Sequence, residues 1–205
     1  MKRLPTEQRR KQIAEAALRI IAERGLRRFT VAAISEEVGL ADGTIFRHFE
    51  DKDDIVLEAV NQLEQALIAH ESSRAGAPEA EFEGDSLDRL GMFLRRRIAL
   101  IRERPEIAKA LFSDDLAQAG PEEAGERVRA LKHRSMQYVR NHLQQALDQG
   151  LISEEHDADE LLYLVHGTAL AIVFSDEDLS TVTDRTIEPE AIWHAVETML
   201  RADAD

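Results

Sequence analysis

The chain is 205 residues long and contains no cysteine, and its formal net charge is −14. This length can bury a sizeable core, and the lack of cysteine excludes disulfide scaffolds, thiolate zinc sites and cysteine nucleophiles. The N-terminus lacks the pattern of a signal peptide, and no run approaches the ~18 consecutive apolar residues of a membrane-spanning helix, so we expect a cytoplasmic protein.

Helix-forming residues dominate the composition, whereas glycine, proline and aromatic residues are few. The spacing of the apolar residues predicts an all-α fold of about nine helices. In chain order, the first helix is expected over residues 6–24, a pair of short helices over 30–49, and a fourth helix from about residue 51. Residues 72–85 show no periodicity and predict a loop.

The second part of the chain continues the helical pattern. Five more helices are expected, at about 86–103, from Pro105, from Gly120-Pro121 to Gly150, from Asp157, and at about 189–201. Residues 175–188, which lie between the last two, are polar and acidic and predict a connection.

Residues 30–52 carry the most informative motif of the chain. Thr30 can cap the first of two short helices, because its hydroxyl oxygen can accept a hydrogen bond from an unpaired backbone N–H. Gly39 stands where this helix must end, and glycine is the usual residue for the left-handed position that follows a helix. Asp42 is a candidate cap for the second helix. Two short helices joined by a tight turn of this kind predict a helix-turn-helix.

The second of these helices has an apolar side and a polar side. Ile45 and Phe49 are four residues apart and face inward, whereas Thr44, Arg47 and His48 point outward. A compact polar and basic face on the second helix is what a helix-turn-helix presents to the major groove of DNA. The motif therefore predicts a DNA-binding protein.

From about Arg10 to Val56 the chain resembles the N-terminal DNA-binding domain of the tetracycline-repressor (TetR) family. The matching elements are Gly25, Thr30, Ile34-Ser35, Gly39-Leu40, the run from Gly43 to Phe49, and Lys52-Asp-Asp-Ile55. Phe46 stands where the family usually has tyrosine, so we expect a phenolic contact to phosphate to be missing. Ser35 replaces the usual alanine, which changes little.

The resemblance implies a two-domain, homodimeric transcription regulator, most often a repressor. We expect residues 1–52 to form the helix-turn-helix domain and residues 53–205 to bind a small effector and to dimerise. In the family, a ligand moves the fourth helix, which carries the DNA-reading head. The two heads of the dimer then no longer match successive major grooves, which lie ~34–36 Å apart on a palindromic operator.

The charges fit this division. Residues 1–52 carry 11 basic and 8 acidic side chains, and the remaining residues carry 15 basic and 32 acidic ones. A positive end on an acidic body is typical of a protein that binds DNA through one part. We interpret the acidic remainder as an aid to solubility.

The candidate DNA contacts are the polar side chains of the motif and the basic residues just before it. Hydroxyls near helix N-termini can bind phosphate, an arginine can bind guanine or phosphate, and the family has a phosphate contact at the start of its fourth helix. The candidates are Arg27, Arg28, Thr30, Thr44, Arg47, His48 and Lys52.

The expected eighth helix is apolar on nearly every side between Leu161 and Phe174. Such a helix is buried on every side, and a second copy of the chain is one way to bury its outer face. In the family, the last two helices form a four-helix dimer interface. The candidates for this interface are Leu170, Phe174, Trp193, Val196 and Leu200. The alternative is a central core helix without a partner.

A set of methionine, aromatic and polar residues on the fifth to eighth helices is a candidate ligand pocket. Such side chains hold small apolar molecules and orient them with a few polar groups. The candidates are Met92, Phe93, Arg97, Phe112, Met136, Tyr138, Tyr163, His166 and Thr168. An apolar or amphipathic effector is expected, because the acidic body would repel a polyanion. Taken singly, each of these residue types is more often an ordinary core residue.

No arrangement of residues indicates an enzyme. The sequence lacks a Ser/His/Asp arrangement, a Gly-rich phosphate loop and a His-Glu-x-x-His pattern. Residues 154–160 are acidic but lack the glycine and spacing of a calcium loop. We therefore expect neither a cofactor nor a metal. An alternative function is a DNA-binding dimer that has no small-molecule site and is controlled by a protein partner or by its abundance.

Overall fold

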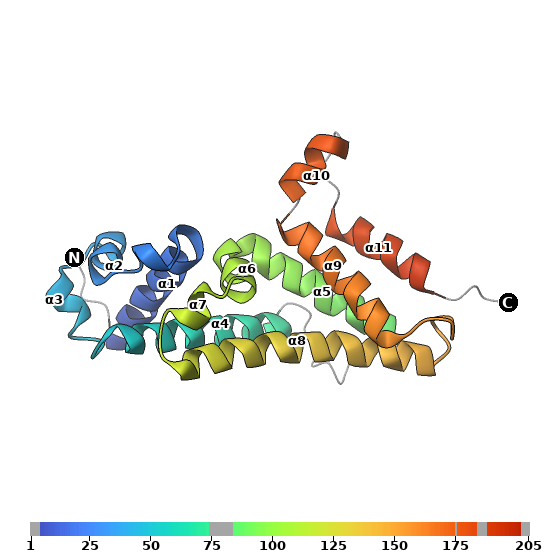
Figure 1. Ribbon diagram of the computed structural model, residues 1–205, viewed down its shortest axis with the longest axis horizontal. Helices are drawn as coiled ribbons and strands as arrows, with labels where there is room; N and C mark the ends of the chain where they lie inside the picture. Colours follow the sequence, from blue (N-terminus) through green and yellow to red (C-terminus); the bar gives the residue numbers. More distant parts are fainter. Residues whose placement is uncertain (1–4, 74–83, 175, 184–187, 202–205) are drawn as a thin grey trace. The chain divides into compact units, whose positions relative to one another are not determined.

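The computed structural model describes residues 5–73, 84–174, 176–183 and 188–201. Over these residues the chain consists of helices α1 to α11, one 3-10 turn, and an isolated antiparallel β-bridge between Ile152 and Arg201 (Figure 1). The all-α prediction is confirmed. The expected loop over residues 72–85 lies for the most part outside the described residues. None of the helices in the described part of the chain is long and apolar enough to cross a membrane.

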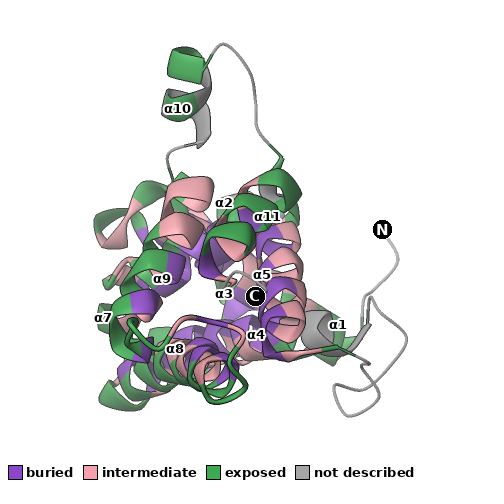
Figure 2. Cartoon of the chain, turned by 90° about the vertical axis from the view of Figure 1, so that its right-hand side faces the viewer, coloured by how far each residue is buried: buried purple, intermediate pink, exposed green. Residues whose placement is uncertain are grey.

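The nine expected helices are present, and two short helices are additional. These are α7 (Asp115–Gln118) and α10 (Asp176–Thr183). The second of them shows that the connection expected over residues 175–188 contains a short helix. The α10 residues whose burial is described are exposed (Figure 2), and exposed positions leave no apolar periodicity in the sequence.

The chain divides into two compact units. One comprises Met1–Ile68 and Arg104–Lys132, and the other comprises Ala69–Glu103 and His133–Asp205. The boundaries between the compact units therefore do not fall at residues 52/53, where we expected the DNA-binding domain to end. The functional division at that point stays a prediction, because compactness does not show which residues bind DNA or a ligand.

The first unit is built around α1, whose apolar residues from Ile13 to Ile21 are buried. Helices α2, α6 and α7 and the 3-10 turn pack against it. Apolar residues at helical spacing on α4, among them Ile55, Val56 and Leu63, are also fully buried. The elements of this unit are α1 (Thr6–Arg24), the turn Leu26–Arg28, α2 (Val31–Val38), α3 (Asp42–Ile45), most of α4 (Lys52–Ser73), α6 (Pro105–Phe112), α7 and the first part of α8 (Glu122–Asp148).

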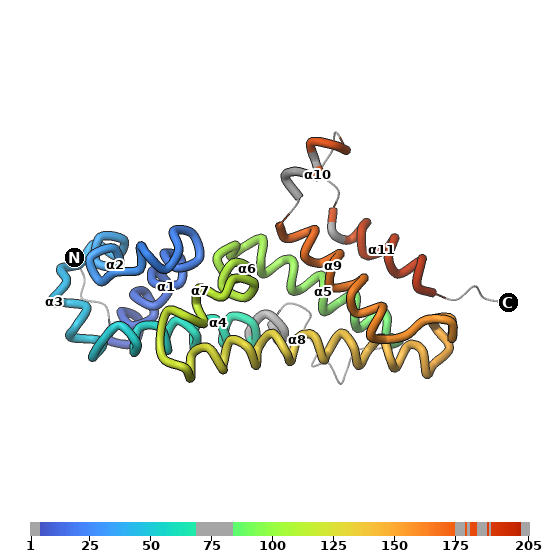
Figure 3. Tube along the Cα trace, in the orientation of Figure 1, coloured from blue at the N-terminus to red at the C-terminus, as the bar shows by residue number. Residues whose placement is uncertain are grey.

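The second unit contains α5 (Ser86–Glu103), the rest of α8, α9 (Ala158–Phe174), α10 and α11 (Pro189–Leu200). The chain reverses direction after α8 and returns as α9 (Figure 3). Gly150 makes this reversal possible, because its φ of 69° lies in the left-handed region that favours glycine. Helices α9 and α11 both pack on α5.

The core of the second unit is one apolar cluster. It draws leucines from α5, the C-terminal half of α8, and the inward faces of α9 and α11. Arg201 ties the end of α11 to the start of α5, because its guanidinium pairs with the Asp85 carboxylate at 2.8 Å. This arrangement places three helices, α5, α9 and α11, around a common interior.

Candidate DNA-binding interface and effector pocket

The first helix of the expected motif begins and ends as the sequence indicates. The Thr30 hydroxyl accepts a hydrogen bond from the backbone N–H of Ala33 at 3.1 Å. Gly39 adopts φ 66° and ψ 40°, and the next backbone N–H, that of Leu40, donates to the carbonyl of Ser35 at 2.9 Å. This is the hydrogen-bond pattern of a Schellman helix end. The turn of the motif is therefore held by local hydrogen bonds.

The second helix, α3, is a single turn from Asp42 to Ile45. Its N-cap is Ala41, and no side chain caps it, so the expectation that Asp42 is the cap is wrong. Asp42 instead lies in the first turn, where the helix dipole favours an acidic group. Ile45 and Phe49 are buried as expected.

The outward face of α3 and the turn after it is chemically mixed. Gly43 and Arg47 are exposed, Thr44 and His48 are partly exposed, and the Phe46 ring is 53% exposed. This face therefore offers a guanidinium, a hydroxyl and an apolar ring. These are three chemistries that can meet base edges or thymine methyl groups in a major groove.

Arg10 of α1 holds in place the reading segment, by which we mean α3 and the turn after it (residues 42–49). Its guanidinium donates to the backbone carbonyl of His48 and to the Asp54 carboxylate at 3.3 Å, and it lies 4.1 Å from the centre of the Phe49 ring. The same group lies 3.8 Å from Glu58. Sequence analysis missed this role, since no local pattern shows which basic residue of α1 reaches residues 48–58.

The start of α4 is capped by acidic side chains. The Asp51 carboxylate accepts from the backbone N–H of Asp54 at 2.9 Å, and the Asp54 carboxylate accepts from the backbone N–H of Glu50 at 3.3 Å. Lys52 follows this cap and is exposed, and its ammonium lies 4.8 Å from the centre of the Phe29 ring. Packing on this ring limits where the Lys52 charge can go.

The basic residues around the motif fall into two groups. Arg19 and Arg24 both pair with Glu37, at 3.2 Å and 2.8 Å, so their charge is partly neutralised. Arg27, Arg28 and Arg47 are exposed, and within the described part of the chain they make no ion pair. These three and Lys52 carry the positive charge that this segment can present to a phosphate backbone.

The aromatic part of the expected ligand pocket is a packed stack. Phe93 of α5 stacks on Tyr138 of α8 with ring centres 4.5 Å apart, and Tyr138 stacks on His142 at 4.2 Å. The Arg97 guanidinium lies 5.1 Å from the centre of the Phe93 ring. The structure thus brings three of the expected residues together, but they fill space on α5 and α8 instead of lining a cavity.

The other expected pocket residues are scattered. Tyr163 is 83% exposed and Phe112, which belongs to the first compact unit, is 40% exposed, so neither faces the interior of the second unit. Met92, Met136 and His166 are partly buried. Burial lowers the pKa of His166 below its ordinary value of 6.5. Only Thr168 of the expected set lines the pocket described next.

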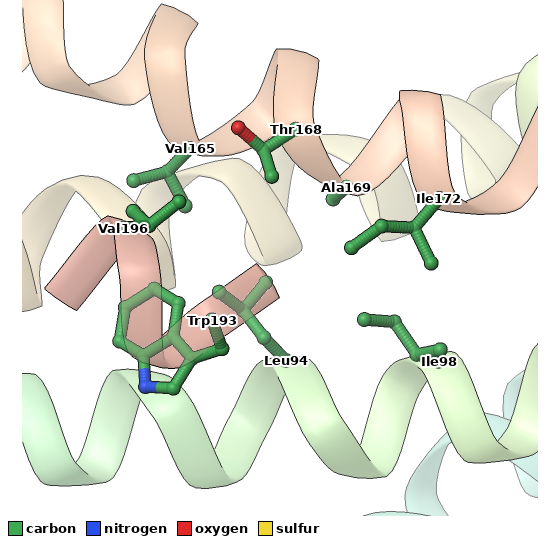
Figure 4. A pocket seen from close by; sticks show the side chains of 8 residues that line it. All are labelled: Leu94, Ile98, Val165, Thr168, Ala169, Ile172, Trp193 and Val196. Atoms are coloured by element: carbon green, nitrogen blue, oxygen red, sulfur yellow. The ribbon is translucent and has the colours of Figure 1, made fainter. Parts of the chain in front are cut away.

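A small pocket lies between α5, α9 and α11 (Figure 4). The space between the lining side chains is about 270 Å³ and includes open solvent, and the enclosed part of it is about 10 Å³. The lining residues are Leu94, Ile98, Val165, Thr168, Ala169, Ile172, Trp193 and Val196. Apart from the Thr168 hydroxyl and the indole N–H, the lining is hydrocarbon. The sequence pattern did not reveal it, because leucine, isoleucine and valine at helical spacing indicate any core.

The residues expected at the dimer interface differ in how far they are buried. Trp193 and Leu200 are buried in the core of their own unit, so they have little surface for a partner chain. Leu170 and Val196 are partly buried and Phe174 is half exposed. Three further apolar side chains on these two helices are exposed: Tyr163 and Leu164 on α9 and Met199 on α11.

A family model and the first curated relatives match only part of the chain in sequence, whereas solved structures are similar in fold to nearly all of it. Residues 13–59 match the family model described as bacterial regulatory proteins, tetR family. A curated relative, the fatty acid metabolism regulator protein of Bacillus subtilis, is 44% identical over 46 residues, which are 22% of this chain and 24% of that protein. The chain spans 24% to 35% of the length of the first three curated relatives it matches, and two of these are named HTH-type transcriptional regulators.

Solved structures match over nearly the whole chain. The transcriptional regulator FadR from Bacillus subtilis, in complex with stearoyl-CoA, is 20% identical with a TM-score of 0.62, and the match covers 95% of this chain and 98% of that one. The ketosteroid transcriptional regulator of Mycobacterium tuberculosis is 19% identical with a TM-score of 0.71, covering 95% and 96% of the two chains.

These proteins are named as regulators, not as enzymes, which agrees with the absence of a catalytic pattern in the sequence. The similarity of sequence lies in the helix-turn-helix unit, and the similarity of fold extends over both units. Residues 13–59 of the chain thus match the tetR family of bacterial regulatory proteins, and the fold of both units is similar to that of the solved regulators.

Proposed function

We propose that the protein is a homodimeric transcriptional repressor that binds a palindromic operator and is released by a small apolar or amphipathic effector. The DNA-binding part of this proposal rests on the structure of the reading segment. It follows a turn held by Gly39, and it has an outward face with Thr44 and Arg47 and an arginine clamp from α1. A DNA-binding regulator acts where the chromosome is, so the cytoplasm is part of this proposal.

The effector class is supported by chemistry and by similarity. The pocket on α5, α9 and α11 is lined almost wholly by hydrocarbon. The similar structures are named with stearoyl-CoA and with ketosteroids, which are both rich in hydrocarbon. To cause release, the effector must bind more tightly to the conformation that does not bind DNA.

Self-association is supported by the exposed apolar side chains on α9 and α11. Tyr163 is 83% exposed and Met199 is 77% exposed, and exposed apolar surface of this kind marks interaction sites. A dimer would also provide the two reading heads that a palindromic operator needs.

The experiment for the DNA-binding part is selection of bound sequences from a random DNA pool. We expect a palindromic site whose half-sites are centred about one helical turn, ~34–36 Å, apart. Binding to the selected site should be much tighter than binding to a scrambled site of the same composition. Equal affinity for both at equal salt concentration would contradict specific operator binding.

A second candidate is a DNA-binding dimer controlled by a protein partner or by abundance. The packed stack of Phe93, Tyr138 and His142 favours it, because it fills space that a larger ligand would need. Fatty acids, acyl-CoA esters and steroids would be tested for two effects at once: a raised melting temperature and a weakened operator complex. These effects are linked by one coupling free energy. If no compound of these classes has either effect, the second candidate is favoured.

A further inference from the structure

Trp193 occupies an unusual position at the edge of the apolar pocket. Its side chain is only 5% exposed, and its indole N–H has no hydrogen-bond partner within the described part of the chain. Buried donors without a partner are rare in native proteins. In Figure 4 the nitrogen lies on the side of the ring that faces α5, whereas the pocket extends from the ring toward Ile98 and Ile172.

Gly91 explains why the indole can rest there. A Cβ atom on Gly91 would lie 2.2 Å from the indole nitrogen and 2.8 Å from a ring carbon of Trp193. These distances are far shorter than non-bonded atoms allow, so any other residue would force the ring away. Gly91 is the one glycine of α5. The indole therefore lies in a notch on that helix, with its donor pressed against a surface that does not accept a hydrogen bond.

The pocket beside the ring selects against charge. None of its eight lining residues is charged, and the Thr168 hydroxyl already donates to the carbonyl of Leu164 at 2.9 Å. A charged group placed there would lose its hydration without gaining a partner. A hydrocarbon group has no such hydration to lose, and its transfer from water into the pocket is favourable.

The pocket is also small for a ligand. The space that its lining encloses is only about 10 Å³, whereas pockets that hold small molecules have volumes of about 300–1,000 Å³. Trp193 is the largest side chain in the lining. Movement of its ring out of the notch would change the size of the pocket most, and would also release the unpaired N–H to find an acceptor.

We propose that this pocket holds the uncharged hydrocarbon part of the effector and that Trp193 is its movable wall. The indole rests in the Gly91 notch when the pocket is empty and leaves the notch when hydrocarbon enters. Any charged or polar end of the effector lies outside the eight lining residues. This inference rests on the proposed function, because it assigns a site to the effector of the regulator.

The chain allows a direct test, because Trp193 is its only tryptophan. Bromine quenches indole fluorescence on contact, so ω-bromoundecanol would be titrated into the full-length protein and undecanol would serve as the matched probe without bromine. We expect the brominated alcohol to remove most of the tryptophan emission in a saturable way. Undecanol should shift the emission without quenching it and should compete with the brominated probe.

Operator binding measured in the same samples separates this inference from the proposed function. Release of DNA without quenching would mean that the alcohol acts at another site, which overturns the inference and leaves the proposed function standing. Quenching without release would support the site but contradict effector-induced release by this class of molecule. The absence of quenching up to the solubility limit of the probe would also overturn the inference.

Gly91→Ala tests the notch without any ligand. The added methyl group should expel the indole, so the emission should shift to longer wavelength and quenching by acrylamide should increase. Gly167→Ala is the matched control, because it adds the same methyl group to α9 of the same unit, where a Cβ would meet nothing within 4 Å. Its emission should equal that of the wild type.

Circular dichroism would show that both glycine variants are folded. An unchanged emission of folded Gly91→Ala would overturn the notch as the resting place of the indole. If Gly91→Ala does not fold, the quenching of the wild-type protein decides the inference alone.

Discussion

At the scale of single residues, the outward face of α3 and the start of α4 offer two kinds of positive charge. Arg47 is exposed and follows α3 directly, whereas the Lys52 ammonium lies against the Phe29 ring at the N-terminus of α4. An arginine can make a bidentate contact to guanine, but a lysine near a helix N-terminus is suited to phosphate. We therefore assign base reading to Arg47 and phosphate binding to Lys52 as a proposal.

Arg47→Ala should weaken binding to the selected operator by about 1–3 kcal/mol and relax specificity at one position of each half-site. Lys52→Ala should weaken binding to all sequences alike, and should lower the slope of log affinity against log salt concentration by about one per head. Affinities for the operator and for a scrambled site, measured across a salt series, would check both. Identical behaviour of the two variants on both DNAs would contradict this assignment.

At the scale of elements, Arg10 connects α1 to the reading segment and to α4. It touches the carbonyl of His48, the Phe49 ring and the Asp54 carboxylate. Arg10→Ala should weaken operator binding by about 1–2 kcal/mol because the reading segment loses hydrogen bonds to a charged group. Arg10→Lys should restore only part of this, because an ammonium cannot reproduce the fork of the guanidinium.

Two measurements distinguish this positioning role from a phosphate contact. The salt slope of Arg10→Ala should equal that of the wild type, since a residue that only positions others releases no counterions. Hydrogen exchange of the amides near residue 49 should become faster in the variant. A lowered salt slope with unchanged exchange would show that Arg10 binds phosphate instead.

The junction of α5 and α11 should make the second unit sensitive to acid. Burial alone would raise the pKa of Asp85, but the hydrogen bonds from Arg201 and from the backbone N–H of Asp88 lower it below its ordinary value of 3.8. A lowered folded-state pKa means that the pair stabilises the fold above the unfolded value, and that this stabilisation is lost as the pH falls through the lowered pKa.

Asp85→Asn should therefore cost stability at neutral pH, by no more than about 1 kcal/mol because the pair is partly exposed to solvent. The difference from the wild type should shrink as the pH falls below about 4. Urea unfolding of both proteins at a series of pH values would measure it. A difference that stays constant from neutral pH down to strongly acidic pH would rule out the Asp85–Arg201 pair as its source.

At the scale of the whole molecule, the exposed apolar residues of α9 and α11 predict self-association. Light scattering should give about twice the 23.1 kDa mass of the chain at micromolar concentration. Leu164→Asp places a charge on this face, where the side chain is 47% exposed, and should shift the protein toward monomer because an unpaired charge is costly to bury. Ile68→Asp, at a residue of α4 that is 58% exposed, is the control and should remain dimeric. A monomeric wild type would remove the basis for palindromic binding.

The sequence by itself determined the features that depend on neighbours along the chain. The cap at Thr30, the left-handed Gly39 and the inward positions of Ile45 and Phe49 follow from contacts within a few residues. The boundaries of the long helices follow from the same local rules. This is why the helix-turn-helix, the all-α fold and the family could be predicted from the sequence.

Tertiary structure alone decided which helix faces meet. Apolar periodicity shows that a face is buried but not what covers it. Tyr163 therefore looked like a pocket residue and is exposed, and Trp193 looked like a dimer residue and is buried against Gly91. The clamp from Arg10 joins residues at least 38 positions apart, and such pairings are set by the packing of helices and not by the spacing of residues along any one of them.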